Sequence, residues 1–514
     1  MIRSFSISKN RLLFSLLVFI VLAGSVIIRA NVARKHAFPE GDEGPWLRMA
    51  ARAFTGEFLN SGVIEHDLYA TRELPHPEDN RSPLFPVLLS AGSIFTGNLF
   101  RAAQIINIIL FAACSATALF FLLHRFDKVS VLLCIVFTGV SPIFIINSAH
   151  IYNDVTIAFG YFLVLLTAPA APTSRRNAFI MGVVVGLLFL MKISSIFLLL
   201  PTGFFFLRRG FHPENRVRAL CFLIPFLLLA APWMVRNKLL FGSPFYQFTG
   251  YTMWIDSMKE IFSVNIPRPS MATYVAAHGA LFTFIVRPLV GFKNLLLQLL
   301  THDHRLTLYL LPFVIFGVYR LRRDKAFWVS LLVFSVPYLG LMSHVAYGFW
   351  VDRYLLVYYL MIYLAAGNGI AATAELVKNV YLRNGLLVLL TAIPLSAVAY
   401  PIEYYLSDRG SERPIDASAR SIIRQIEPLV PDTTAVLSPF LGLYAFLHDM
   451  RVVNTIGIGS PEDLRTLVDA YSIRFALLDT KDSTTLDLLF ALVGRERVTC
   501  RKSNRDFSFY EILE

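Results

Sequence analysis

Residues 12–28 read LLFSLLVFIVLAGSVII, and residues 40–54 read EGDEGPWLRMAARAF. The first stretch is apolar and follows three basic residues, which is typical of a membrane-spanning helix whose N-terminus is cytoplasmic. The second stretch opens with three carboxylates, Glu40, Asp42 and Glu43. Carboxylates at a membrane boundary are costly to desolvate and are rarely needed for packing, so they indicate a functional site beside the first helix.

The composition of the whole chain agrees with a membrane protein. Of its 514 residues, 56% are hydrophobic and 16% are charged, and the mean hydropathy is +0.59. Soluble domains are about 45–50% apolar and about 25% charged. The net charge of +12 comes from basic residues in short loops between apolar runs rather than from one basic face, so nucleic acid is not expected as a partner.

Apolar runs predict about eleven membrane crossings, although several runs are shorter than the roughly 20 residues that a crossing needs. After the first run they cover residues 99–123, 129–147, 152–169, 177–191, 193–207, 217–232, 306–319, 326–342, 354–373 and 384–400. Basic residues gather in alternate loops, at 125–128, 175–176, 208–218, 320–325 and 378–383. By the positive-inside rule these loops are cytoplasmic, and the loops that alternate with them face the other side.

Three regions are therefore expected outside the cytoplasm: residues 30–98, residues 233–305 and the segment after about residue 400. Within the first, an amphipathic helix is expected near Trp46 to Phe58. The apolar stretch 83–96 has only fourteen residues and two prolines near its start, so it is predicted to be interfacial or re-entrant rather than a crossing.

The composition becomes charged and mixed after about residue 400, which predicts two domains: a transmembrane module over 1–400 and a soluble domain over 401–514. An amphipathic helix is expected at 416–428, and TAVLS (434–438), RVVNT (451–455) and FALLD (475–479) are expected to be strands. The soluble domain is thus predicted to be small, α/β and extracytoplasmic.

Asp42 and Glu43 stand immediately before a predicted helix, and Asp154 stands at the start of the run from 152. Each acid has two interpretations from sequence: it caps a helix N-terminus, or it does chemistry at the membrane boundary. Topology puts Asp42 and Asp154 on the same side of the membrane. Read together, they are the best pair for general-base and orienting roles.

Three cations are candidate partners for a lipid phosphate. Lys192 lies between two apolar runs, where it either extends to the interface or binds a phosphate beside the acids. Arg81 precedes Pro83 in the first outer region. Arg353 lies at another outer boundary, where an ion pair with Asp352 is the simpler explanation.

No cofactor is expected from the sequence. The four cysteines share no metal-ligand spacing, and three of them lie in apolar runs. His302, Asp303 and His304 are close in sequence, but side chains two residues apart on a helix do not converge. A divalent metal is possible, but the sequence does not support one.

Several motifs, in order along residues 10–375, resemble those of the GT-C integral membrane glycosyltransferases, with the aminoarabinose-lipid A transferases and protein O-mannosyltransferases as the most similar groups. The motifs are the DE pair before WLRMA, NRSPLFPVLL (80–89), IYNDVTIAF (151–159), GLLFLMKISS (186–195), PWMVRNKLLFGSPF (232–245) and RYLLVYYLMIYLAAG (353–367). Trp46 stands where the family has an aromatic hydroxyl residue.

The resemblance implies transfer of a sugar, a hexose or a pentose, from a polyprenyl-phosphate-linked donor to an acceptor hydroxyl in the cell envelope. It implies that Asp42 acts as general base, and that Glu43 and Asp154 orient the acceptor or stabilise the positive charge that develops on the sugar. Lys192, Arg81 and Arg353 would neutralise the departing phosphate.

The expected partners are the lipid-linked donor, the membrane, and a lipid, glycan or protein acceptor. The expected location is a bacterial inner membrane. Two alternatives remain open: an oligosaccharide ligase or polymerase, and a lipid or solute transporter. A transporter would place its ionisable groups near the membrane midplane, usually with repeat symmetry, and neither feature is visible in the sequence.

Overall fold

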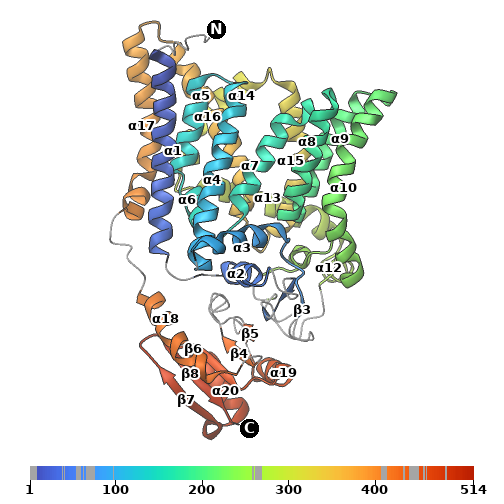
Figure 1. Ribbon diagram of the computed structural model, residues 1–514, viewed down its shortest axis with the longest axis vertical. Coiled ribbons are helices and arrows are strands. Elements are labelled where there is room, and N and C mark those ends of the chain that lie inside the picture. Colours follow the sequence, from blue (N-terminus) through green and yellow to red (C-terminus); the bar gives the residue numbers. More distant parts are fainter. Residues whose placement is uncertain are drawn as a thin grey trace.

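The computed structural model consists of a helical bundle and a smaller α/β domain beyond one end of the bundle (Figure 1). It describes residues 9–36, 39, 41–53, 59–61, 63–64, 76–96, 98–257, 260, 269–406, 414–431, 434–438, 451–454, 458, 460–480 and 483–513. Glu40 and residues 54–58 lie outside the described residues. The predicted class, a mainly helical membrane protein with a small C-terminal α/β domain, is confirmed.

The bundle consists of apolar helices of 8 to 29 residues, most of them joined by short connections. These are α1 (Lys9–Lys35), α4 (Leu99–Leu123), α5 (Lys128–Val140), α6 (Pro142–Ala149), α7 (Asp154–Thr167), α8 (Arg175–Met191), α9 (Leu199–Arg208), α10 (Pro213–Phe241), α13 (Arg287–Thr301), α14 (Leu306–Leu321), α15 (Lys325–Val345), α16 (Leu356–Glu375) and α17 (Val380–Leu406). Short helical turns η2 (Ala168–Thr173), η3 (Ile193–Leu198) and η6 (Asp352–Leu355) continue or precede three of them.

The count of about eleven crossings is not confirmed. Among the described residues, eight helices are long and apolar enough to span a membrane, or nine if α5 and α6, which meet at 60°, form one broken span. The predicted runs at 177–191, 193–207 and 306–319 are helical but short. Conversely, Phe282–Thr301 is a candidate span that the sequence prediction assigned to an outer loop, because polar residues interrupt its apolar pattern.

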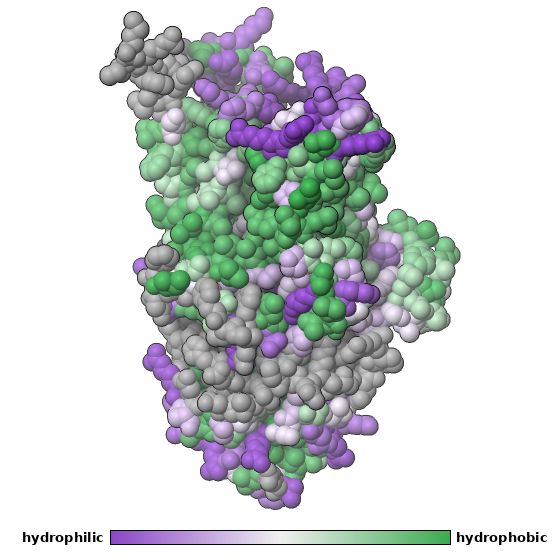
Figure 2. All heavy atoms as spheres, turned by 45° about the vertical axis from the view of Figure 1, so that its right-hand side comes forward, coloured by the Kyte–Doolittle hydropathy of each residue, from purple (hydrophilic) through white to green (hydrophobic). Residues whose placement is uncertain are grey.

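Hydrophobic side chains form a broad band around the bundle, and hydrophilic side chains gather at the end opposite the α/β domain (Figure 2). Two helices occupy the centre of the bundle: 83% of the residues in the most apolar stretch of the span that contains α16 are buried, and 72% in that of the span that contains α7. By contrast, only 17% of the residues in the corresponding stretches of α1 and α17 are buried, as expected for helices that face lipid.

Glycine allows two central helices to pack at short range. A Cβ atom on Gly317 of α14 would lie 1.7 Å from the carbonyl oxygen of Ala365, and one on Gly369 of α16 would lie 1.9 Å from that of Phe313. Small residues at such a crossing are the usual means by which membrane helices approach closely.

The break between α5 and α6 is held by a buried arginine of α1. Arg29 is fully buried and donates hydrogen bonds to the carbonyl oxygen of Gly139 at 2.8 Å and to Ser148 Oγ at 2.6 Å. A helix break inside a membrane leaves carbonyl groups without their intrahelical partners, and another helix must satisfy them. Arg29 does this here, and its guanidinium also lies 3.6 Å from the centre of the Phe111 ring.

Two short helices, α2 (Glu43–Ala51) and α3 (Leu84–Thr96), lie across the ends of the long helices nearest the α/β domain (Figure 1). We call this the site end of the bundle. The α3 helix has 13 residues, too few to cross a membrane. It agrees with the interfacial or re-entrant prediction for residues 83–96.

The C-terminal domain contains α18 (Pro414–Ile426), α19 (Pro461–Tyr471) and α20 (Ser483–Val493) with strands β4 (Ala435–Ser438), β5 (Arg451–Asn454), β6 (Phe475–Asp479), β7 (Val498–Ser503) and β8 (Phe507–Ile512). The three strands predicted from sequence are β4, β5 and β6. The β7–β8 hairpin was not predicted. The described sheet has the order β2-β5-β4-β6-β8-β7, in which β2, β5, β4 and β6 pair parallel and the last two pairs are antiparallel.

The sheet includes a strand from the region between α1 and α4, because β2 (Val63–Ile64) pairs with β5. A second region, between α10 and α13, also contacts the domain. There η4 (Phe248–Trp254) precedes Ile255, which is 1% exposed and packs in the apolar core of the C-terminal domain. Arg287 donates to the Ile255 carbonyl oxygen at 2.6 Å and pairs with Asp256 at 2.6 Å, which fixes this contact. The remaining described elements of the two regions are β1 (Asn60–Ser61), β3 (His76–Pro77), α12 (Met271–His278) and a π-helical turn at Phe282–Val286.

Candidate active site

Asp42 lies just before α2 at the site end of the bundle. Its backbone is helical, with φ −63° and ψ −16°, and its side chain makes no capping hydrogen bond, so the capping interpretation does not describe it. The carboxylate instead accepts from two arginines, Arg353 at 2.6 Å and Arg81 at 3.4 Å. It is 37% exposed, and it therefore meets solvent while two cations hold its orientation.

Asp154 is the first residue of α7 and is not the cap of that helix, which is Asn153. Its carboxylate is 6% exposed and forms an ion pair with Lys192 Nζ. The second carboxylate oxygen lies 3.8 Å from Nε of Arg353. Lys192 reaches this position because α8 ends there: its backbone is extended, with φ −158° and ψ 124°, before η3 begins.

The contacts join five residues into one series of alternating charge, which we call the charge chain. Its order is Arg81, Asp42, Arg353, Asp154 and Lys192. The five come from five separate parts of the sequence: the residue before α2, the segment before α3, the start of α7, the end of α8, and the η6 turn before α16. All five were named from sequence as site candidates, and the structure brings all five together; their chemical roles stay predictions.

Aromatic rings lie against the cations of the charge chain. Lys192 Nζ is 3.9 Å from the centre of the Tyr354 ring, and the Arg353 guanidinium is 5.3 Å from the rings of Tyr152 and Tyr354. The Arg81 guanidinium is 5.6 Å from the Trp46 ring. Such contacts stabilise a partly desolvated cation and also provide apolar faces. Neither Tyr152 nor Tyr354 was predicted as a site residue, although each stands within two residues of a predicted one.

Tyr152 remains protonated at ordinary pH. Burial raises the pKa of its hydroxyl above the usual value, and the negative charges of Glu43 and Asp42 raise that pKa further. The phenol can therefore donate a hydrogen bond beside the charge chain but does not act as a base.

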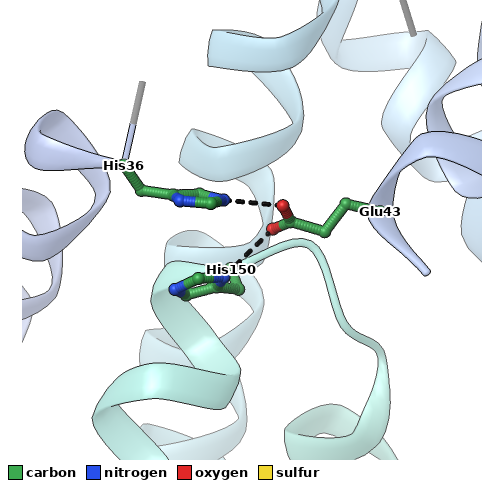
Figure 3. Close-up of side chains that lie close together, drawn as sticks. All are labelled: His36, Glu43 and His150. Atoms are coloured by element: carbon green, nitrogen blue, oxygen red, sulfur yellow. Dashed lines mark hydrogen bonds and ion pairs between the residues drawn. The ribbon is translucent and has the colours of Figure 1, made fainter. Parts of the chain in front are cut away.

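Glu43 has a different set of partners from Asp42. Its carboxylate is fully buried, and one oxygen lies 2.6 Å from His36 Nε2 while the other lies 3.4 Å from His150 Nδ1 (Figure 3). The backbone N–H of Ile151 donates to it at 2.8 Å. Burial raises the pKa of the Glu43 carboxyl, but the hydrogen bonds and positive charge of His150 and His36 outweigh burial and hold that pKa below its usual value.

The two histidines were missed by the sequence analysis. His36 follows the last turn of α1, and His150 follows α6 and precedes IYND, so both stand next to segments that were named. The two rings are 3.9 Å apart between centres. Within the described part of the chain, His36, Glu43 and His150 are the group of side chains whose ligand atoms could hold a metal ion, each within 4.8 Å of the others. The sequence left a divalent metal possible but gave no support for one, and it did not identify this group.

Other candidates from sequence have structural partners. Asp352 pairs with His302 at 3.2 Å rather than with Arg353. Asp303 is buried and accepts from Ser141 Oγ at 2.7 Å and from the Tyr363 hydroxyl. The neighbours His302 and Asp303 therefore point to different partners.

No protein-family model matches the sequence, and no curated protein is similar to it in sequence. Solved structures are similar in fold. ArnT from Cupriavidus metallidurans in the apo state superposes with a TM-score of 0.62 at 12% identity, over 96% of this chain and 97% of ArnT. The Archaeoglobus fulgidus oligosaccharyltransferase in the apo form superposes with a TM-score of 0.61 at 14% identity, over 93% of this chain and 71% of that chain.

Both structures are glycosyltransferases of the GT-C fold, and the likeness extends over almost the whole of the present chain. At such low identity the likeness establishes architecture and not substrate. The fold expected from the sequence motifs is confirmed: this chain has the GT-C fold of integral membrane glycosyltransferases.

Proposed function

We propose that the protein transfers a sugar from a polyprenyl-phosphate-linked donor to an acceptor hydroxyl. The observation that carries the proposal is the charge chain, in which a solvent-accessible carboxylate, Asp42, stands one arginine away from a lysine–carboxylate pair. Hydroxyl attack on a glycosyl phosphate needs a base for the hydroxyl and cations for the leaving phosphate. The charge chain contains both.

The leaving phosphate is assigned to Lys192, Arg353 and Arg81. When the bond between the anomeric carbon and the phosphate oxygen breaks, the electron pair leaves with the polyprenyl phosphate, whose negative charge increases. A cation about 4 Å from that charge contributes roughly 4 kcal/mol at an effective dielectric constant near 20. Lys192 and Arg353 are only partly exposed, so solvent screens them less than surface residues.

Asp42 is assigned as the general base. Its carboxylate takes the proton from the acceptor hydroxyl as the hydroxyl oxygen bonds to the anomeric carbon. In the absence of substrate, Arg353 and Arg81 neutralise Asp42. A bound phosphate competes for the same two arginines, so donor binding leaves the carboxylate freer to accept a proton. Asp154 then orients Arg353 and Lys192 and stabilises positive charge on the sugar ring.

Glu43 acts beside the reacting groups in this proposal. Because its carboxylate is directed to His36, His150 and the Ile151 N–H, it orients the start of α2 and thereby Asp42. This assignment replaces the role that the sequence resemblance implies for Glu43, which is to orient the acceptor or to stabilise positive charge on the sugar.

The comparisons support a lipid-linked donor. ArnT has been solved bound to undecaprenyl phosphate, and the archaeal oligosaccharyltransferase AglB has been solved with a dolichol-phosphate. By the distribution of basic loops, the site faces away from the cytoplasm, at the outer face of a bacterial inner membrane with the N-terminus inside. The likeness to AglB favours one second candidate, a donor carrying a preassembled oligosaccharide.

Two measurements test the proposal. Purified protein in liposomes is mixed with undecaprenyl-phosphate hexose or pentose and with membrane extract from cells that lack the protein, and released undecaprenyl phosphate is quantified. Mass spectrometry of envelope lipids and glycans from deletion and restored strains then identifies the product. A mass increment of one sugar supports the proposal, and an increment of several supports the oligosaccharide donor. Release of no undecaprenyl phosphate from any donor, with unchanged envelope glycans, would contradict both.

A further inference from the structure

The side chains of His36, Glu43 and His150 converge from three different segments of the chain (Figure 3). His36 follows α1, Glu43 opens α2, and His150 lies between α6 and α7. Both imidazole rings direct a nitrogen toward the Glu43 carboxylate, at 2.6 Å for His36 Nε2 and 3.4 Å for His150 Nδ1. Glu43 is fully buried, and His36 and His150 are largely buried.

The backbone at both histidines is fixed by one face of α4. Gln104 Nε2 donates to the His36 carbonyl oxygen at 3.0 Å, and Asn107 Nδ2 donates to the His150 carbonyl oxygen. Residues three apart on a helix lie on the same face, so α4 positions both imidazoles at once. The Ile151 N–H, at 2.8 Å, orients the carboxylate between them. The cluster is therefore arranged in advance rather than assembled by flexible side chains.

Two imidazoles and one carboxylate form a common ligand set for first-row transition metals. Tetrahedral zinc binds nitrogen and oxygen ligands at about 2.0–2.2 Å, which places neighbouring ligand atoms roughly 3.3 Å apart. The pairs with Glu43 are 2.6 and 3.4 Å apart, and all three ligand atoms lie within 4.8 Å of one another. Small side-chain rotations would bring them to one ion. A metal would displace the proton shared between His36 and Glu43, as metal binding to imidazole does in general.

We infer that His36, Glu43 and His150 form a binding site for a divalent transition metal, with zinc as the ion that the ligands and burial fit best. The three protein ligands leave one coordination position for water. The ion would join α1, α2 and the α6–α7 connection at one point, and Glu43 is adjacent in sequence to Asp42. This inference goes beyond the proposed function, since the site binds metal whether or not the chain transfers sugar.

Direct metal binding tests the inference without any sugar donor. The full-length protein is purified in detergent, stripped with EDTA, and titrated with Zn²⁺; bound metal is counted by inductively coupled plasma mass spectrometry. Co²⁺ is titrated in parallel, since its visible absorption reports coordination geometry. We expect one equivalent per chain. Loss of outer-shell partners alone weakens metal affinity about 10–100-fold, so His36→Gln, Glu43→Gln and His150→Gln should each weaken it by at least about 100-fold.

The matched control is His124→Gln, an exposed histidine whose Nδ1 contacts the Phe120 carbonyl oxygen at the other end of the bundle. It should bind metal as the unmodified protein does. Where a ligand variant does not fold, X-ray absorption at the zinc edge of the unmodified protein decides instead: nitrogen and oxygen ligands including two imidazoles support the site.

Three results would overturn the inference. They are the absence of a stoichiometric ion in the unmodified protein, sulfur ligands in its absorption spectrum, and equal affinity in the ligand variants and the control. Any of them would leave His36, Glu43 and His150 as a hydrogen-bonded triad. None would affect the proposed sugar transfer, because that is measured separately by release of undecaprenyl phosphate.

Discussion

Asp154 and Lys192 form an ion pair, and the proposed function predicts that neutralising one partner has the opposite effect on phosphate binding from neutralising the other. If Lys192 binds the lipid phosphate, then Asp154 competes with that phosphate for the same ammonium group. Asp154→Asn should therefore tighten the binding of undecaprenyl phosphate, while Lys192→Met should weaken it. Sugar transfer should fall in both variants, because the proposed reaction needs the orienting carboxylate of Asp154 and the phosphate-binding ammonium group of Lys192.

The expected change in binding free energy for each substitution depends on the distance between the removed charge and the phosphate, and on how exposed the side chain is. Removing a cation within about 4 Å of a phosphate removes roughly 4 kcal/mol at an effective dielectric constant near 20. Lys192 is 18% exposed, so screening reduces this to about 2–3 kcal/mol, or roughly 30- to 150-fold in the dissociation constant. Asp154 stands farther from the phosphate, and its loss should tighten binding by about 1.4 kcal/mol, roughly tenfold.

The two substitutions should also reduce the stability of the folded protein by different amounts. Lys192→Met leaves the Asp154 carboxylate, 6% exposed, with Arg353 at 3.8 Å as its remaining cation in the charge chain. This variant should lose about 2–3 kcal/mol of stability. Asp154→Asn should cost less, because the lysine nitrogen remains over the Tyr354 ring at 3.9 Å.

The assay is binding of undecaprenyl phosphate to purified protein in detergent, followed by native mass spectrometry, with thermal melting as the test of folding. Lys325→Met, at the other end of the bundle, is the matched control and should change neither quantity. Weaker binding in both Asp154→Asn and Lys192→Met, with both variants folded, would refute the reasoning. The pair would then act only to hold α7 against the end of α8.

Three further predictions concern other parts of the molecule. Arg353→Lys should lower kcat/KM about tenfold with the charge retained, because one ammonium group does not reproduce the guanidinium contacts at two carboxylates, whereas Arg320→Lys at the opposite end should have no effect on turnover. Burial raises the pKa of Asp303 to about 7, above the value near 3.9 of an exposed aspartate, so the folded protein holds a proton that the unfolded chain releases. The melting temperature should therefore fall as pH rises from about 4 to 7, and Asp303→Asn should reduce that fall; identical pH profiles would contradict this. Arg29→Leu should destabilise the protein by about 2–4 kcal/mol through loss of its hydrogen bonds at the α5–α6 break, without changing undecaprenyl phosphate binding.

The helices of the bundle were largely predictable because hydrophobic periodicity and length decide them. Residues 99–123 match α4 at both ends, and two of the basic loops, at 125–128 and 320–325, lie side by side, since Arg125 pairs with Asp324. The count of crossings is not confirmed: the candidate span Phe282–Thr301, in which polar residues interrupt the apolar pattern, was not predicted, and the helix at 306–319 is shorter than the candidate spans. Length alone does not distinguish a short buried helix from a broken span.

The strands of the C-terminal domain were predictable only in part. The apolar cores of β4, β5 and β6 are evident in sequence, because central strands are buried on both faces. The β7 strand is largely exposed and carries Arg501 and Lys502, so it lacks that signal. Pairing of β2 with β5 joins residues almost 400 positions apart in number, from Val63 to Val452, and no local pattern predicts it.

The residues of the charge chain were predictable, whereas their pairing was not. Arg353 was expected to pair with its neighbour Asp352, yet the structure places it between Asp42 and Asp154. Short-range pairing is the simpler hypothesis when only sequence spacing is known. The histidine pair was missed for a related reason: His36 and His150 have no metal-ligand spacing, and only the fold brings them to Glu43.

The measurement that tests the central claim most directly is turnover by Asp42→Asn, with Asp42→Glu beside it, in liposomes with the donor lipid. Removing a general base typically costs about 10²–10⁴-fold, so the asparagine variant should lose transfer by that factor, and the glutamate variant should recover part of it. The asparagine variant should still bind undecaprenyl phosphate at least as tightly as the unmodified protein, because the loss of the carboxylate charge releases Arg353 and Arg81. Transfer at the unmodified rate by folded Asp42→Asn protein would contradict the account.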